Sequence, residues 1–127
     1  MKEALDFLKE NNEVAFATIG NGRPQMRVFQ IMKQSGTTLW FATGPHKRVY
    51  AELQENPAVE ILSRCGNISV RVSGDAVFDV PDYKSLAYFR VEIDRLDYFD
   101  LTPTPPVLRH YDRASGQYVD LNPFGEK

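Results

Sequence analysis

Apolar side chains in residues 2–11 recur at a spacing of three and four positions, with charged residues between them. This spacing is typical of an amphipathic helix. From residue 14 onward, most apolar positions alternate with polar ones or follow one another in short runs, as they do in half-buried and buried strands. The pattern therefore predicts a mainly β chain with short helices, the first of them at residues 2–11.

Turn residues divide this strand-rich part of the chain into six or seven predicted strands. Gly20 and Gly22 predict a tight hairpin loop, Gly66 predicts a second one, and Gly74 marks a bulge or bend in a long strand. Closely spaced, mostly antiparallel segments favour a closed barrel over an α/β sheet. The predicted strands cover residues 14–20, 25–33, 37–43, 58–65, 67–80 and 90–101. Residues 110–121 are predicted as a hairpin with "ASG" at its turn, or as one strand with a kink.

Two further segments carry helix signals. Residues 46–55 place apolar side chains on one face and end at Asn56 and Pro57, which a helix cannot easily pass. Residues 81–89 begin with Pro and Asp, a combination that is typical of a helix start. We therefore expect two or three short helices among the strands.

Composition narrows the class of protein. The chain has 127 residues, 43% hydrophobic and 25% charged, with a net charge of -2. These values predict one globular domain over residues 1–127 and give no electrostatic support for binding nucleic acid or an anionic membrane. Cys65 is the single cysteine, so it cannot form an internal disulfide, and no metal-ligand spacing surrounds it. No apolar stretch suits a signal peptide or a membrane span, so we expect a cytoplasmic protein.

Three basic or potentially basic residues, His46, Lys47 and Arg48, lie at the predicted start of the second helix. A helix N-terminus carries the positive end of the helix dipole, so each cation in the first turn costs about 0.3–1 kcal/mol when nothing offsets it. Either these side chains extend into water, or an anion lies among them.

Arg27 is a second unusual cation. It falls on the same predicted strand face as Phe29 and Ile31, where an unpaired guanidinium would be costly. One interpretation is that this face is exposed, or that Arg27 forms an ion pair with Asp or Glu of a neighbouring strand.

The alternative interpretation joins Arg27 to the basic turn. Residues 25–33 and 37–43 are expected to form a hairpin, and the second of these strands leads directly into the turn. A phosphate lying there would meet Arg27, Lys47, Arg48 and free helix N–H groups together, which is the chemistry of phosphate capture.

The sequence motifs, taken in their order along the chain, resemble those of the pyridoxamine 5'-phosphate oxidase-like family of FMN-binding split barrels, in its short single-domain form. The resemblance covers about residues 2–80 and depends on "VAFATIGNGRPQMRVFQI", "LWFATG" followed by "HKR", "YAELQENPAVEIL" and "VRVSGDAVF". It implies a mainly β, antiparallel, Greek-key-like split barrel with short helices, and FMN as the cofactor.

In that family a strand arginine and a basic pair after the third strand hold the FMN phosphate. The resemblance therefore implies a phosphate site at Arg27, Lys47 and Arg48. Members are typically homodimers with FMN at the interface, which implies that Ser69 and Arg71 reach the partner's flavin. The residues implied along the flavin and its ribityl chain are Val28, Phe29, Gln30, Ala42 and Thr43.

The chain also departs from the full-length oxidase. Met32 stands where the oxidase has a lysine for the substrate phosphate, and Ser69 stands where short relatives have a bulky aromatic residue. Arg109 and His110 differ in spacing from the oxidase's C-terminal substrate contacts. The resemblance therefore supports FMN binding better than it supports vitamin B6 oxidation.

Three functions remain open from the sequence. The first is an FMN-dependent oxidoreductase that acts on a small molecule, with NAD(P)H as the reductant. The second is a non-redox module that binds another phosphorylated or carboxylated ligand, or haem, at the same basic turn. The third is a dimeric scaffold without a ligand. No residue is assigned as catalytic acid or base, and His110 is interpreted as a surface histidine.

Overall fold

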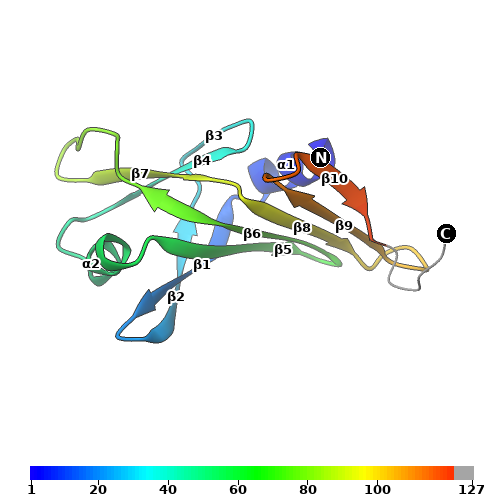
Figure 1. Ribbon diagram of the computed structural model, residues 1–127, viewed down its shortest axis with the longest axis horizontal. Coiled ribbons are helices and arrows are strands. Elements are labelled where there is room, and N and C mark those ends of the chain that lie inside the picture. Colours follow the sequence, from blue (N-terminus) through cyan, green and yellow to red (C-terminus); the bar gives the residue numbers. More distant parts are fainter. Residues whose placement is uncertain (122–127) are drawn as a thin grey trace.

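The computed structural model describes residues 1–121, which contain two helices and ten strands (Figure 1). The helices are α1 (Lys2–Glu10) and α2 (Arg48–Glu55). The strands are β1 (Glu13–Gly20), β2 (Arg23–Gln30), β3 (Lys33–Ser35), β4 (Thr38–Thr43), β5 (Ala58–Cys65), β6 (Ile68–Val77), β7 (Ala87–Glu92), β8 (Arg95–Asp100), β9 (Val107–Asp112) and β10 (Gln117–Asp120).

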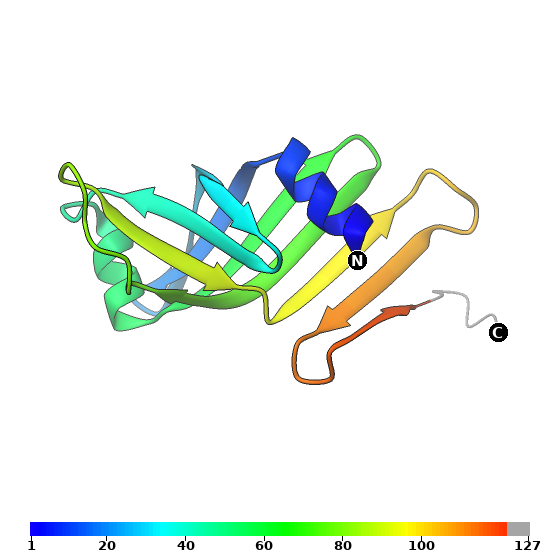
Figure 2. The ribbon, with the colours of Figure 1, turned by 90° about the horizontal axis from the view of Figure 1, so that it is seen from above.

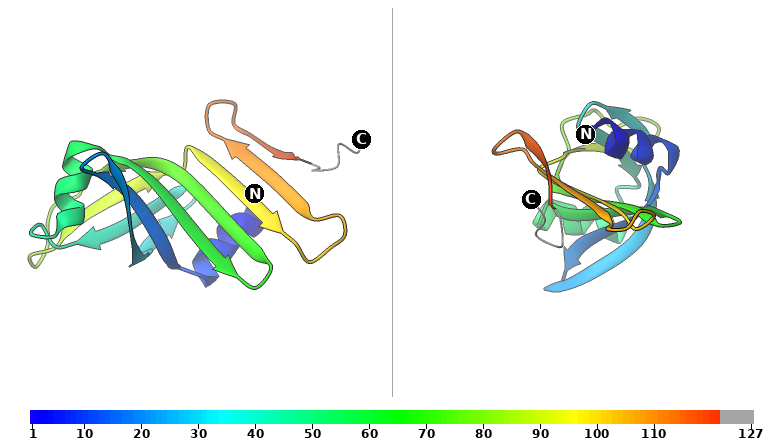
Figure 3. Two further views of the ribbon diagram at one scale, coloured as in Figure 1. Left: turned by 90° about the horizontal axis from the view of Figure 1, so that it is seen from below. Right: turned by 90° about the vertical axis from the view of Figure 1, so that its right-hand side faces the viewer.

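All strand pairs in the sheet are antiparallel. Seven strands follow one another in the order β10-β9-β8-β6-β5-β1-β2, and β7 joins β6 to the remaining pair, β4 and β3. Seen from its end, the sheet curls around the core (Figure 3). The mainly β, antiparallel prediction is therefore confirmed.

Strand β6 belongs to both parts of the sheet. Residues 68–73 pair with β8, whereas Ala76 and Val77 pair with β7. The change of partner occurs at Gly74, where a Cβ atom would lie only 2.5 Å from the backbone oxygen of Glu92. The predicted bulge or bend is thus the point where β6 passes from one partner to the next, and only glycine allows the close approach of the backbone.

The core lies between the inner face of the curled sheet and helix α1. Ala4 and Leu8 of α1 are fully buried against it, and Figure 2 shows the helix lying across the strands. Phe41 lies at its centre, with ring centroids 5.1 Å from Phe16 and 5.4 Å from Phe89. Each such pair contributes about 0.5–1.5 kcal/mol beyond its buried area, so these rings hold β1, β4 and β7 together.

The prediction of one strand over residues 25–33 is wrong. β2 ends at Gln30 and pairs with β1, whereas β3 pairs with β4. The expected hairpin between residues 25–33 and 37–43 is therefore limited to β3 and β4. Residues 90–101 are likewise divided between β7 and β8, and residues 110–121 form the predicted hairpin of β9 and β10 with "ASG" in its turn, so the described residues contain ten strands and not six or seven.

The helix predicted over residues 81–89 is also wrong. Lys84 and Ser85 have φ angles of 50° and 65°, and Tyr83 forms an antiparallel bridge with Leu86. Left-handed backbone at two successive positions is incompatible with a right-handed helix. The segment is a turn that leads into β7.

No helix in residues 1–121 has the length and apolar character needed to cross a membrane. Over the same residues, no three or more His, Cys, Asp and Glu side chains are grouped in a way that could hold a metal ion.

Candidate functional site

Helix α2 starts directly after a tight turn at the end of β4. The Lys47 N–H donates to the Gly44 carbonyl oxygen at 2.9 Å, and the helix begins at Arg48 with Lys47 as its N-cap. A Cβ atom on Gly44 would lie 2.7 Å from the ring of His46, an exposed side chain that would have to move away. The helix starts two residues later than predicted because His46 and Lys47 belong to the turn.

The N-terminus of α2 lacks the groups that usually satisfy a helix start. No side chain caps it, and its first turn contains no acidic residue. Lys47 and Arg48 are exposed and form no ion pair within residues 1–121. Unsatisfied N–H groups, the helix dipole and two cations therefore combine at one turn, which makes it suitable for an anion.

Arg27 extends from β2 to Glu52 in the middle of α2. Its Nη2 donates to the Glu52 carboxylate at 2.9 Å, and its Nη1 donates to Thr18 Oγ1 at 2.9 Å and to the Phe16 carbonyl oxygen at 3.1 Å. Glu52, only 7% exposed, also accepts from the Thr18 hydroxyl at 2.6 Å. Arg27 is therefore paired with a carboxylate, as one interpretation expected, but the partner comes from a helix and not from a strand.

Glu52, the ion-pair partner of Arg27, lies on the same helix as Arg48. Arg48 lies four residues before Glu52, so both lie on one face of α2, about one turn apart. The Arg27 guanidinium, bonded to Glu52, thus reaches within one turn of Arg48. We call Arg27, Lys47 and Arg48 the basic corner.

The residues predicted along the flavin fall on both sides of β2. Val28 and Gln30 are exposed, whereas Phe29 points inward, with its ring centroid 4.8 Å from that of Phe16. Within residues 1–121, β2 pairs only with β1, so its other edge presents backbone N–H and C=O groups that no neighbouring strand uses. The surface of β2 that a ligand could contact therefore consists of the side chains of Val28 and Gln30 and this free edge.

Ala42 and Thr43 lie at the end of β4, which pairs on both sides with β3 and β7. Ala42 is half-buried, and Thr43 is buried with 6% of its surface exposed. Thr43 directly precedes the turn that carries Lys47. Both residues are therefore near the basic corner along the chain, and neither offers a large exposed surface.

Ser69 and Arg71 do not join the basic corner within one chain. They lie on β6, three strands away from β2 in the sheet, a separation of roughly 14 Å at the usual strand spacing.

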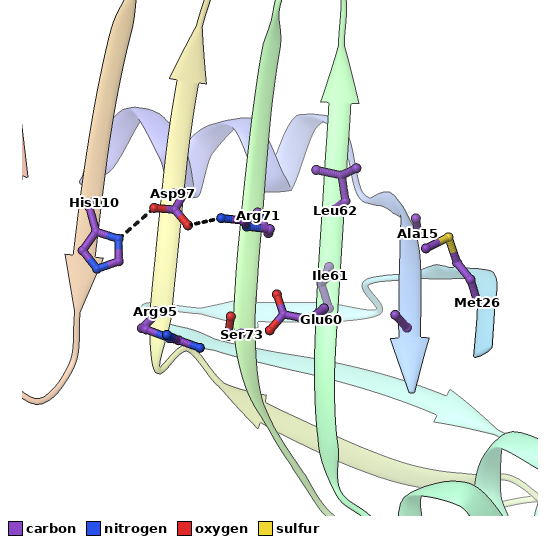
Figure 4. A pocket seen from close by; sticks show the side chains of 11 residues that line it. Ala15, Met26, Glu60, Ile61, Leu62, Arg71, Ser73, Arg95, Asp97 and His110 are labelled. Carbon is purple, nitrogen blue, oxygen red and sulfur yellow. Dashed lines mark hydrogen bonds and ion pairs between the residues drawn. The ribbon is translucent and has the colours of Figure 1, made fainter. Parts of the chain in front are cut away.

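A pocket of about 540 Å³ lies over the outer face of the sheet, where Arg71 is located (Figure 4). Small side chains line two parts of it: Ala15 and Ala17 lie on β1, beside Met26, and Ser73 lies on β6. Helix α1 is on the other side of the strands (Figure 4). The remaining lining residues are Met26, Glu60, Ile61, Leu62, Arg71, Arg95, Asp97 and His110.

Three charged or titratable side chains form a chain of contacts along this pocket. Asp97 accepts from Arg71 Nη2 at 3.0 Å and lies 2.7 Å from His110 Nδ1, and Figure 4 shows the three in one row across β6, β8 and β9. Burial alone would raise the pKa of Asp97, but the hydrogen bonds from His110 and Arg71 outweigh it and lower the pKa below its usual range. Asp97 is therefore held as a carboxylate between two donors.

The sequence did not identify Glu52, Asp97 or His110 as members of a site. For Glu52 the sequence does contain a signal. Helical spacing places this charged residue on the same face of α2 as Val49 and Leu53, which predicts a buried carboxylate in need of a partner. For the other two, no local signal exists, since Asp97 and His110 meet only because β8 and β9 pair with Asp97 opposite His110.

The curled antiparallel sheet, with its two short helices, defines a split-barrel protein. A model of the family described as "Pyridoxamine 5'-phosphate oxidase" matches residues 1–112, and the chain belongs to that family. The resemblance inferred from the motifs and the split-barrel fold are therefore confirmed. No curated protein sequence matches the chain.

Solved structures show the same fold at low sequence identity. PhzG from Burkholderia lata 383, in complex with tetrahydrophenazine-1-carboxylic acid, has a TM-score of 0.78 at 15% identity, covering 96% of this chain and 90% of PhzG. A pyridoxamine 5'-phosphate oxidase-related, FMN binding protein from Nostoc punctiforme has a TM-score of 0.78 at 16% identity, covering 96% and 94%. A heme binding protein from Mycobacterium smegmatis has a TM-score of 0.63 at 12% identity, covering 76% and 52%.

Proposed function

We propose that the protein binds FMN with its phosphate in the basic corner and acts as an FMN-dependent oxidoreductase on a small molecule. The observation that carries this proposal is the uncapped start of α2, where Lys47 and Arg48 form no ion pair within residues 1–121 and Arg48 lies about one turn before Glu52, the partner of Arg27. A similarly folded protein that is described as FMN binding supports the choice of cofactor.

The donors of the basic corner fit a phosphate dianion. Lys47 and Arg48 supply charge, and the first N–H groups of α2 supply backbone donors. Arg27 has five N–H donors, and its three hydrogen bonds within residues 1–121 leave two of them for a ligand. Glu52 fixes the guanidinium so that these donors are oriented before a ligand arrives.

Bound FMN would supply hydride or electron transfer, and the protein's part is binding and orientation. The free edge of β2 and the exposed side chains of Val28 and Gln30 would contact the flavin and ribityl chain, with Ala42 and Thr43 beside them. We propose a homodimer in which Ser69 and Arg71 of one subunit approach the flavin of the other, and NAD(P)H as the reductant.

The first test is the absorption spectrum of the purified protein, followed by titration of the colourless fraction with FMN. We expect flavin bands, release of FMN on denaturation and saturable uptake of one FMN per subunit. Absence of bands together with no uptake of added FMN would overturn the proposal. Light scattering on the same sample checks the dimer, for which we expect twice the mass of one chain.

Haem is the second candidate, because a similarly folded protein is described as heme binding. The same titration with hemin distinguishes the two: a saturable haem Soret band in a protein that takes up no FMN supports haem. The chain has two histidines, His46 and His110, as possible nitrogen ligands, so the band of a haem complex should change in His46→Ala or His110→Ala.

A further inference from the structure

The tip of the β1–β2 hairpin carries a chemically reactive pair of residues, Asn21 and Gly22 (Figure 1). Gly20 pairs with Arg23, so the turn contains only these two residues, and both are exposed. Over the whole sequence, Asn21 is the one asparagine that glycine follows directly. Asparagine is a thermally labile residue, and this pair can react without an enzyme or a bound ligand.

We propose that Asn21 deamidates spontaneously in the folded protein, through attack of the Gly22 backbone nitrogen on the Asn21 side-chain carbonyl carbon. The new C–N bond closes a five-membered succinimide ring, and the side-chain NH2 group leaves with the Gly22 amide hydrogen as ammonia. Water then adds to one of the two ring carbonyls and opens the ring, which gives aspartate or isoaspartate. No atom is oxidised or reduced, and FMN takes no part.

Both reacting groups are free. Within residues 1–121, neither the Gly22 N–H nor the Asn21 side-chain amide forms a hydrogen bond. A Cβ atom built on Gly22 would meet no atom within 4 Å, so the space around the attacking nitrogen is open. Glycine has no side chain of its own to hinder the approach to the Asn21 carbonyl carbon. The reaction therefore disturbs no packed side chain at the turn.

The backbone of the turn must rotate before the ring can close. Asn21 and Gly22 have φ angles of 55° and 70°, the values of a tight two-residue turn. To reach the side chain, the Gly22 nitrogen must rotate about the bond between the Asn21 Cα and carbonyl carbons, which opens the last pair of the hairpin. Exposed loop tips open at a much lower free energy than core strands. We therefore expect Asn21 to react in the folded protein, but more slowly than in the unfolded chain.

The β5–β6 hairpin provides a matched control in the same chain. Its turn also contains two residues, Gly66 and Asn67, because Cys65 pairs with Ile68, and Asn67 is exposed. Here isoleucine follows the asparagine, and its branched Cβ crowds the attacking nitrogen. Asn67 should therefore keep its amide much longer than Asn21 under the same conditions.

The product would place a negative charge close to Glu52. A Cβ atom on Gly20, the residue before Asn21, would lie only 2.5 Å from Glu52 Oε2. A second carboxylate near this buried one is unfavourable because like charges repel. Isoaspartate also lengthens the backbone of the turn by one methylene group, which the pairing of Gly20 with Arg23 cannot accommodate. Deamidation should therefore loosen the end of the hairpin.

NMR of the intact, isotope-labelled protein follows both turns at once, because each asparagine side chain gives its own pair of amide signals. The protein is kept warm at mildly alkaline pH. We expect the Asn21 pair to disappear at least about tenfold faster than the Asn67 pair, because isoleucine hinders ring closure at Asn67. The rate should rise with pH, because the attacking nitrogen must lose its hydrogen.

The same measurement on urea-unfolded protein separates the chemistry of the sequence from the state of the turn. We expect Asn21 to react there as well, and faster than in the folded protein. Retention of the Asn21 signals in the folded protein for as long as those of Asn67 would overturn the proposal. If Asn21 reacts only in urea, the turn protects it, and the proposal is equally wrong.

Variants separate the effect of the new charge from that of the longer backbone. Asn21→Gln keeps a side-chain amide but would need a six-membered ring, so its amide should persist. Asn21→Asp carries the charge of the product on a backbone of normal length. We expect backbone amides in residues 19–24 to exchange with solvent faster in the isoaspartate product than in Asn21→Asp, and equal exchange would exclude an effect of the longer backbone.

The charge effect is measured by thermal unfolding. Asn21→Asp should lower Tm by a few degrees relative to Asn67→Asp, which adds the same charge to the control turn. Equal Tm values of the two variants would overturn the effect assigned to Glu52.

Discussion

Glu52 determines what Arg27 can do. The carboxylate is buried, and it receives hydrogen bonds from both Arg27 and the Thr18 hydroxyl. A buried carboxylate that loses its cation costs more than the pair itself contributes, because the remaining charge stays out of water. Arg27 therefore stabilises the fold through Glu52, and in the proposed site it also binds the phosphate.

Arg27→Ala should reduce both stability and FMN binding. We expect a loss of about 2–3 kcal/mol in the free energy of unfolding, because Glu52 is left buried without its cation. FMN affinity should fall at least about tenfold through the lost phosphate contact. Urea unfolding without FMN and fluorescence titration with FMN measure the two effects separately.

Glu52→Gln is the control for Arg27→Ala. It keeps the shape of the side chain but removes the negative charge, so FMN affinity should stay equal or rise while stability falls. If Arg27→Ala lowers stability and leaves FMN affinity unchanged, Arg27 is a structural partner of Glu52 only, and the phosphate contacts come from elsewhere.

Strands and turns were predictable from the sequence where neighbouring residues determine them. The hairpin of β1 and β2 closes at Asn21 and Gly22, whose φ angles of 55° and 70° are those of a tight two-residue turn, and the sequence signal is local. The division of residues 25–33 was not predictable in this way. Both halves have strand character, and only the sheet decides that β2 pairs with β1 while β3 pairs with β4.

The same distinction, between residues that are neighbours in the sequence and residues that only the sheet brings together, applies to the candidate site. Lys47 and Arg48 are neighbours in the chain, so the sequence could place them together. Arg27 was expected to approach them through a hairpin, but β2 pairs with β1, and Arg27 forms its ion pair with Glu52 of α2. The row from Arg71 to His110 depends on the order of β6, β8 and β9, which no short stretch of sequence encodes.

Gly74→Ala tests the change of partners along β6. The new Cβ atom would lie 2.5 Å from the Glu92 backbone oxygen and 2.7 Å from Val91 Cγ1, so β6 and β7 must move apart. We expect a loss of about 1–3 kcal/mol in the free energy of unfolding, the usual range for overpacking. Asp75→Ala, one residue further along β6 and exposed, is the control and should change stability by less than about 0.5 kcal/mol. Equal stability of the two variants would show that the strands do not meet closely at Gly74.

The contact between α1 and the C-terminal hairpin depends on Glu3. Its carboxylate accepts from Arg109 Nη1 at 2.8 Å and from the Tyr118 hydroxyl at 2.7 Å. Burial alone would raise the pKa of Glu3, but the bonds from Tyr118 and Arg109 outweigh it and lower the pKa to about 2. Ionised Glu3 thus stabilises the folded state through β9 and β10.

Glu3→Gln should therefore destabilise the protein in a pH-dependent way. Because the pKa of Glu3 is lower in the folded state, its contribution is fully present above the unfolded value of about 4.3 and is lost as the pH falls toward about 2. We expect a deficit of about 0.5–1 kcal/mol at pH 7, as for partly exposed ion pairs, that shrinks over this window. Urea unfolding of both proteins from pH 7 to pH 2 measures it, and a deficit that does not change with pH would exclude the ionic contribution.

At the scale of the whole molecule, the two candidate sites lie on different parts of one curled sheet. The basic corner joins β2 to α2 at one end, and the pocket lies over β5, β6 and β8 on the outer face (Figures 1 and 4). In a homodimer of the proposed kind, Arg71 of one subunit approaches the flavin held by the other.

Comparison of FMN with riboflavin tests the phosphate site most directly, because the two molecules differ only in the phosphate. We expect the wild type to bind FMN at least about a hundredfold more tightly than riboflavin, the equivalent of two charge-assisted contacts. Lys47→Ala should reduce this ratio about tenfold without changing riboflavin affinity, whereas Lys9→Ala, an exposed cation on α1, should leave the ratio unchanged. Equal affinities of the wild type for FMN and riboflavin, or a ratio that Lys47→Ala does not alter, would contradict a phosphate site at the basic corner.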